Sequence, residues 1–237
     1  MILPSVRASF GRREAQILLA LAGPEGEARL GEQGIDALLD DARLTRELLM
    51  REQISTAPAP LVFYLLVRHA LLAREIFDRP LADYTAAVLL EFSQTGRAFS
   101  ADGTEESRFL YLADILMELE RARGEREFQL RVHLGNFALW LAGIFPDHIT
   151  HRVQRRGAPP LNYYDQMGAM GYRLAAATST AAKHGLGDLL LRASERFTDV
   201  RSALNGLSDA LFFPRPSDAV ERVLREVQDH FARQIRQ

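Results

Sequence analysis

One short stretch combines histidines and arginines at spacings that suit the binding of an anion. His148 and His151 are three residues apart, and Arg152, Arg155 and Arg156 follow closely. On a helix these side chains can share a surface, and guanidinium groups bind phosphate or carboxylate as a fork. An ordinary solvated helix face is the default interpretation of this stretch, and an anion-binding surface for phosphate or an acidic partner is the functional alternative.

Other patterns that carry chemistry are missing from the sequence. The chain has no cysteine, which excludes disulfides, thiolate metal sites and cysteine nucleophiles. It has no GxSxG, no HExxH and none of the Glu-x-x-His pairs of di-iron bundles. His148 and His151 beside Asp147 are spaced like metal ligands, but pairs at this spacing are common by chance. We therefore expect no catalytic residue, no metal and no cofactor.

A second polar set lies inside an unusually apolar stretch. Residues 132–146 carry no formally charged side chain when His133 is neutral, so a helix built from them belongs in a protein interior. The stretch is shorter than the ~20 residues that cross a membrane. His133, Asn136 and Trp140 follow at steps of three or four and therefore share one face of this helix.

The buried histidine and asparagine need hydrogen-bond partners, because an unpaired buried polar group costs about 1–3 kcal/mol. Suitable side chains follow Pro160. A structural network that joins two helices is the favoured interpretation, and a ligand pocket lined by Trp140 and tyrosines is the other. The candidate ligand-binding residues are His133, Asn136, Trp140, Tyr163, Tyr164, Asp165 and Tyr172.

Hydrophobic periodicity places both sets on helices. Apolar residues recur at helical spacing along the chain and no strand-like alternation occurs, while Pro60 and Pro80 suit first turns of helices. We predict one all-α domain over residues 1–237. Its architecture is an irregular or orthogonal bundle of about nine to eleven helices around the central apolar helix, which starts near Glu125.

The predicted partner of the central helix runs from Asn162 to Lys183. Small residues recur along it three or four apart, and this smooth face lets a bulky helix approach closely. They are Gly168, Gly171, Ala175, Ser179 and Ala182.

Other expected helices span residues 12–22, 35–53 with a break near Ala42, and 186–211. A further helix runs to Ala122 with Thr104 or Asp102 as its cap, and a short one begins at Pro146 and stops at Gly157.

The last predicted helix begins at Ser217 and carries a regular apolar stripe. The stripe consists of Val220, Val223, Leu224, Val227, Phe231 and Ile235. Such a stripe is more typical of a docked helix than of an exposed partner surface, although its terminal position leaves dimerisation open.

Net charge and the amino-terminal sequence indicate which partners and which cellular location to expect. The 237 residues carry a net charge of −2, so nucleic acid is an unlikely partner. No basic segment leads into a long apolar run near the amino terminus, and we expect a cytoplasmic protein with no membrane contact.

The middle of the chain resembles a pattern in helical bacterial proteins whose function is not known. Residues 134–149, LGNFALWLAGIFPDHI, match a glycine with Asp or Asn, an aromatic-rich run and Gly-x-Phe-Pro-Glu, with Asp147 in place of the glutamate. A tyrosine-containing helix with glycines follows at residues 162–172. The resemblance implies that this region is a unit, and it implies no activity.

Two functional hypotheses follow. The first is a non-catalytic protein that acts through contacts with a protein partner or as a homodimer. The alternative is a small-molecule-binding protein, or an enzyme of an unrecognised type, that uses the cluster around Asn136 and Trp140.

Overall fold

The structure of the chain, a computed structural model, describes residues 5–50, 57–93, 109 and 111–211. Every regular element among these residues is a helix, and no strand occurs among them. The all-α prediction is therefore confirmed. The α-helices of the described residues are numbered α1 to α13. They are somewhat more numerous than predicted because the expected helices 162–183 and 186–211 are each divided in two.

The 3-10 helices are η1 (Arg7–Ser9) and η2 (Gly23–Glu25). The first α-helices are α1 (Arg12–Ala22), α2 (Gly26–Gln33), α3 (Ile35–Leu39), α4 (Ala42–Met50), α5 (Ala59–Leu72) and α6 (Arg79–Ser93). The others are α7 (Leu112–Arg121), α8 (Gly124–Ile144), α9 (Pro146–Arg156), α10 (Leu161–Ala176), α11 (Ser179–Lys183), α12 (Gly187–Glu195) and α13 (Phe197–Leu211).

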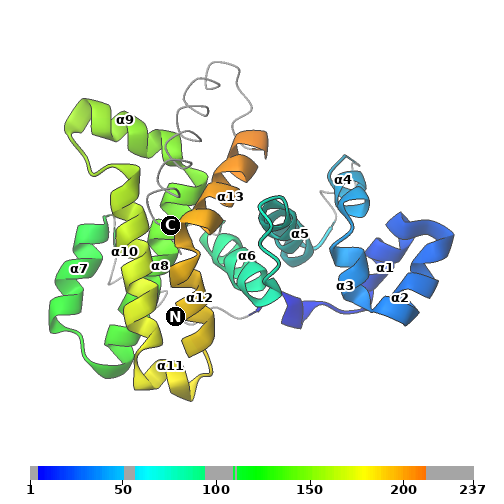
Figure 1. The fold of residues 1–237 in the computed structure, drawn as a ribbon, viewed down its shortest axis with the longest axis horizontal. Helices are drawn as coiled ribbons and strands as arrows, with labels where there is room; N and C mark the ends of the chain where they lie inside the picture. The colour runs from blue at the N-terminus through cyan, green and yellow to red at the C-terminus, as the bar shows by residue number, and fades with distance from the viewer. Residues whose placement is uncertain (1–4, 51–56, 94–108, 110, 212–237) are drawn as a thin grey trace.

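Helices α5 and α6 lie between the amino-terminal helices and the group from α7 to α13 (Figure 1). Helix α5 contacts α4 and α13, and α6 contacts α8 and α12. Helix α8 occupies the middle of the second group, where it packs against α7, α10 and α13. The result is the predicted irregular bundle around a central helix.

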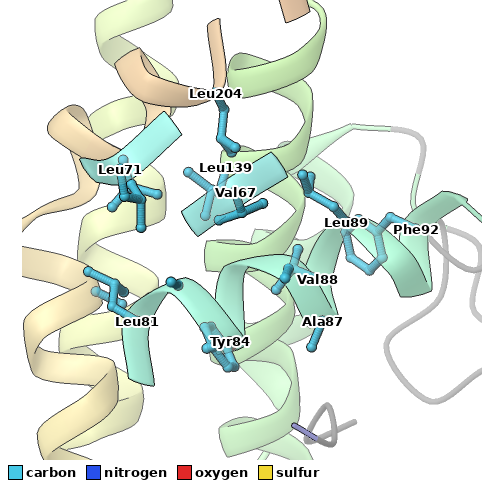
Figure 2. Close-up of a cluster of buried hydrophobic side chains, with 14 of the residues drawn as sticks. Val67, Leu71, Leu81, Tyr84, Ala87, Val88, Leu89, Phe92, Leu139 and Leu204 are labelled. Carbon is cyan, nitrogen blue, oxygen red and sulfur yellow. The ribbon is translucent and has the colours of Figure 1, made fainter. Parts of the chain in front are cut away.

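One hydrophobic core runs through these contacts. Figure 2 shows Val67 and Leu71 of α5 close to Leu139 of α8 and Leu204 of α13, with side chains of α6 beside them. All four of these side chains are buried. Because full burial of such a side chain contributes about 1.5–3 kcal/mol, this shared core holds α5, α6, α8 and α13 in place.

Helix α8 is the predicted central helix, and it begins within one residue of the expected start. Every residue from Val132 to Leu139 is buried, as expected for a helix that is apolar on all faces. No helix among the described residues is both long enough and apolar enough to span a bilayer.

Helices α8 and α10 approach each other closely because glycines occupy their contact. A Cβ atom added at Gly171 would lie 2.8 Å from the backbone oxygen of Arg131 and 3.0 Å from the amide nitrogen of Gly135. A Cβ atom at Gly135 would in turn overlap the ring of Tyr172. Within α10, the predicted face of small residues therefore allows α8 to pack closely against it.

Two expected helices are divided in the structure. The stretch 162–183 is interrupted at Thr178, whose hydroxyl accepts a hydrogen bond from the amide of Ala181 at 3.1 Å and caps α11. The stretch 186–211 is interrupted at Arg196, and the ring of Phe197 then lies 5.9 Å from that of Tyr172. The cap formed by Thr178 explains the break before α11. At the break before α13, Phe197 packs into the core.

The helix predicted to run to Ala122 also differs, because it begins at Leu112. Tyr111 precedes it with an extended backbone and donates its amide hydrogen to Asp114 at 2.9 Å. The proposed caps Asp102 and Thr104 lie outside the described residues, as does the predicted last helix from Ser217.

A charged network attaches the amino-terminal helices to α5 and α6. Arg68 donates to both carboxylate oxygens of Asp40, at 2.7 and 3.0 Å, and Arg79 donates to the same carboxylate at 2.7 Å. Burial alone would raise the pKa of Asp40, but hydrogen bonds and charges from the two arginines hold that pKa below its ordinary value. The carboxylate at the end of α3 therefore stays charged and joins three helices.

Candidate functional site

Helix α9 carries the predicted basic residues on one face. It begins at Pro146, which suits a first helical position, and ends at Gly157, whose φ of 61° is left-handed. Between these ends, four basic residues recur at the three- and four-residue steps that repeat along one side of a helix. They are His148, His151, Arg152 and Arg155.

These four side chains line a single pocket of about 360 Å³ together with Tyr111. Tyr111 comes from the residue just before α7, and the guanidinium of Arg152 lies 5.2 Å from its ring centroid. This cation–π contact joins α9 to the residue that precedes α7 across the pocket. The side chain of Arg156, the fifth predicted residue, is not among those that the structure describes.

The electrostatics of this pocket favour anions. Its described lining residues carry two guanidinium groups and two imidazoles and include no carboxylate. Arg152 and Arg155 lie in the carboxyl-terminal half of α9, where the helix dipole does not favour anions, so the attraction comes from their guanidinium groups. Guanidinium groups form forked hydrogen bonds with oxyanions, and imidazoles add further donors when protonated. The arrangement is suited to holding an anion in place.

His148 and His151 are not joined by enough further ligands to form a metal centre among the described residues. No group of three or more His, Asp or Glu side chains in that part of the chain is placed to hold a metal ion. Asp147, which stands beside them in the sequence, does not complete such a group.

Asn136 lies at the centre of a buried hydrogen-bond cluster. Its Oδ1 accepts a hydrogen bond from the hydroxyl of Tyr84 at 2.7 Å and another from the hydroxyl of Tyr172 at 2.9 Å. The three residues come from α6, α8 and α10. Burial raises the pKa of both tyrosines, so both hydroxyls remain donors. The cluster therefore joins three helices.

Tyr172 was among the predicted partners of Asn136, whereas Tyr84 was not. Tyr84 is a buried residue of α6. Nothing local in the sequence pairs it with a residue so distant along the chain. A tyrosine on a buried face was nevertheless a usable signal, because its hydroxyl needs a partner.

His133 and Trp140 lie among aromatic rings along α8. The ring of His133 is 5.9 Å from that of Phe92 and 6.0 Å from that of Phe137. Trp140 lies 5.7 Å from Phe92 and 5.2 Å from Phe145. His133 is buried and Trp140 is partly buried, so the face that they share runs from the core to the surface.

Asp165 belongs to a different cluster from Asn136. Both of its oxygens accept hydrogen bonds from Arg201, at 3.1 Å from Nε and 2.9 Å from Nη2. Arg201 also donates to Asn205 at 3.0 Å. Tyr163 and Tyr164 lie at the start of α10, where their rings are 5.9 Å apart. The structure thus separates the predicted set, and ligand binding by it stays a prediction.

The cluster around Arg201 also caps α8. The last carbonyl groups of a helix have no donors within it. Asn205 donates to the carbonyls of Ala142 and Gly143 at 2.7 and 2.8 Å, and Ser208 donates to that of Ile144 at 2.7 Å. Helix α13 therefore fixes the end of α8, one residue before α9 begins.

Sequence reasoning missed Arg201, Asn205 and Ser208. They recur at steps of four and three along one side of α13. The same spacing drew attention to His133 and Asn136, so it was a usable signal here as well. What the sequence lacks is any indication that their partners are the carbonyls at the end of α8.

Replacing Asn136 by leucine will lower the free energy of unfolding by about 2 kcal/mol, because the buried hydroxyls of Tyr84 and Tyr172 lose their acceptor. Urea denaturation followed by circular dichroism measures the change. The variant Tyr84→Phe is the control, since it removes one donor and leaves Asn136 bonded to Tyr172. An unchanged midpoint for Asn136→Leu would contradict the structural role of this cluster.

Comparisons of the chain with known protein families, with curated proteins and with solved structures find no match. The resemblance of residues 134–149 to helical bacterial proteins therefore stays a prediction.

Proposed function

We propose that this chain is a binding protein that holds a phosphate group in the pocket beside α9. The observation that carries the proposal is the gathering of two arginines and two histidines around one cavity of about 360 Å³. Four cationic or donor side chains match the several oxygens of a phosphate better than the two oxygens of a single carboxylate.

The geometry supports binding more than catalysis. The described lining of the pocket includes no serine or threonine to act as a nucleophile and no carboxylate to orient either histidine as a general base. Tyr111 instead supplies an aromatic wall that is partly covered by Arg152. Recognition by a protein partner or a second copy, and a cytoplasmic location, remain predictions from the sequence.

Replacing Arg152 and Arg155 together by alanine is expected to weaken phosphate binding at least about tenfold, because a hydrogen bond to a charged group contributes about 1.5–3 kcal/mol. Isothermal titration calorimetry of the full chain with inorganic phosphate and with pyrophosphate measures this loss. Acetate serves as the carboxylate probe, and we expect it to bind more weakly than either phosphate.

The matched control is Arg12→Ala with Arg173→Ala, which removes two exposed positive charges elsewhere on the chain. Its affinity for phosphate should remain that of the unchanged protein. Equal losses in both double variants would assign the binding to general electrostatic attraction and overturn the pocket. Absence of phosphate binding to the unchanged chain would refute the proposal directly.

A further inference from the structure

A second cavity lies where α5, α6 and α8 meet at the surface. It has a volume of about 330 Å³, and the lining residues that the structure describes are apolar except for one serine. The described lining residues are Phe63, Leu89, Phe92, Ser93, Trp140, Ile144 and Phe145. Figure 2 shows Leu89 and Phe92 side by side near the carboxyl end of α6. An apolar hollow of this kind favours an apolar occupant, because filling it removes hydrocarbon surface from water.

The end of α13 lies at the edge of this cavity. Ser208 donates a hydrogen bond at 2.7 Å to the carbonyl of Ile144, which is itself a lining residue. Helix α13 ends three residues later at Leu211. The described part of the chain therefore ends close to the apolar lining.

The sequence of this remainder has a surface that suits the cavity. Its apolar residues fall at helical spacing from Val220 to Ile235, and charged residues such as Arg222, Arg225 and Asp229 fall on the opposite side. Pro214 and Pro216 separate this pattern from α13. An amphipathic pattern of this kind requires an apolar surface to cover.

We propose that residues 217–235 dock by their apolar stripe on the Trp140 cavity of the same chain. Eight residues stand between Leu211 and Val220, and at ~3.3 Å each they reach far enough to place the stripe over a cavity that begins beside α13. Attachment through so short a connection gives an effective concentration on the order of millimolar, which favours this segment over one from a second copy.

Trp140 is the only tryptophan of the chain, so its fluorescence reports on the cavity directly. In the full chain, the double substitution Val223→Asp with Val227→Asp is expected to shift the emission to longer wavelength and to increase quenching by acrylamide. The control Arg222→Gln with Arg225→Gln lowers the net charge by the same two units on the polar side. It should leave both readings unchanged. Identical spectra for the unchanged chain and the aspartate variant would overturn the proposal.

Cross-linking tests which copy supplies the segment, and the absence of native cysteine makes it specific. The full chain with Ser93→Cys and Val227→Cys should form an intramolecular disulfide under mild oxidation. Ser93→Cys with Arg225→Cys, on the opposite side of the segment, should form it much more slowly. A covalent dimer in place of the internal link would assign the occupant to a second copy and overturn the proposal, as would the failure of any link to form.

Discussion

Replacing Asp165 by alanine will lower the free energy of unfolding by about 3–5 kcal/mol, because it leaves the buried guanidinium of Arg201 without its carboxylate. The side chains are nearly inaccessible, with 7% and 2% of their surface exposed. Both carboxylate oxygens of Asp165 accept hydrogen bonds from Arg201, so the substitution removes two charge-assisted hydrogen bonds at once. Urea denaturation followed by circular dichroism measures the loss.

A control distinguishes burial from charge pairing as such. Asp199, in the first turn of α13, forms an ion pair at 3.6 Å with Arg196, which immediately precedes that helix, and 61% of the arginine side chain is exposed. Replacing Asp199 by alanine should cost less than about 1 kcal/mol, because solvent screens an exposed pair. Similar losses at Asp165 and Asp199 would contradict the weight given to burial.

The double variant Asp165→Leu with Arg201→Met tests whether the ion pair stabilises the protein more than apolar side chains in its place would. Removing both charges avoids the unpaired buried guanidinium, so this variant should be more stable than Asp165→Ala. Asn205 loses its contact with Arg201 but keeps the carbonyls of Ala142 and Gly143 as acceptors. If the double variant is instead the least stable, Arg201 has a further structural role.

The clusters on α8 and the basic pocket are mechanically connected. Asn205 and Ser208 hold the final carbonyls of α8, and only Phe145 separates Ile144 from the first residue of α9. The direction in which α9 leaves the bundle therefore depends on the end of α8. Through this junction, residues of α13 that do not line the basic pocket help to position those that do.

The central helix α8 and the helix α9 were predictable from short stretches of sequence. The lack of charge from Val132 to Phe145 predicted the central helix, and Pro146 and Gly157 set the ends of α9. The four basic residues of the pocket were predictable for the same reason. They lie within two turns of one helix, so their proximity is dictated by helical geometry alone.

The remaining parts of the sites depend on contacts between distant segments. Tyr111 reaches the basic pocket from the start of α7, and Tyr84 reaches Asn136 from α6. Arg201 donates a hydrogen bond to Asp165, which the sequence analysis placed in the same candidate site as Asn136. Many side chains offer the same donors, so spacing along the chain cannot select which of them meet. Packing of the helices makes that selection.

Replacing Gly171 by alanine will destabilise the protein by about 3 kcal/mol, at the upper end of the usual cost of overpacking. The new Cβ would lie 2.8 Å from the oxygen of Arg131 and 3.0 Å from the nitrogen of Gly135. Both neighbours are backbone atoms of α8, so relief requires the two helices to move apart. Thermal and urea unfolding of the full chain measure the cost.

The same substitution at Gly206 should have the opposite sign. This glycine lies within α13, and a Cβ there would meet no atom of the described residues within 4 Å. Alanine is favoured over glycine inside a helix by about 0.5–1 kcal/mol, so Gly206→Ala should be more stable than the unchanged chain. Stabilisation by Gly171→Ala as well would mean that α8 and α10 are farther apart in solution than the glycine contacts require.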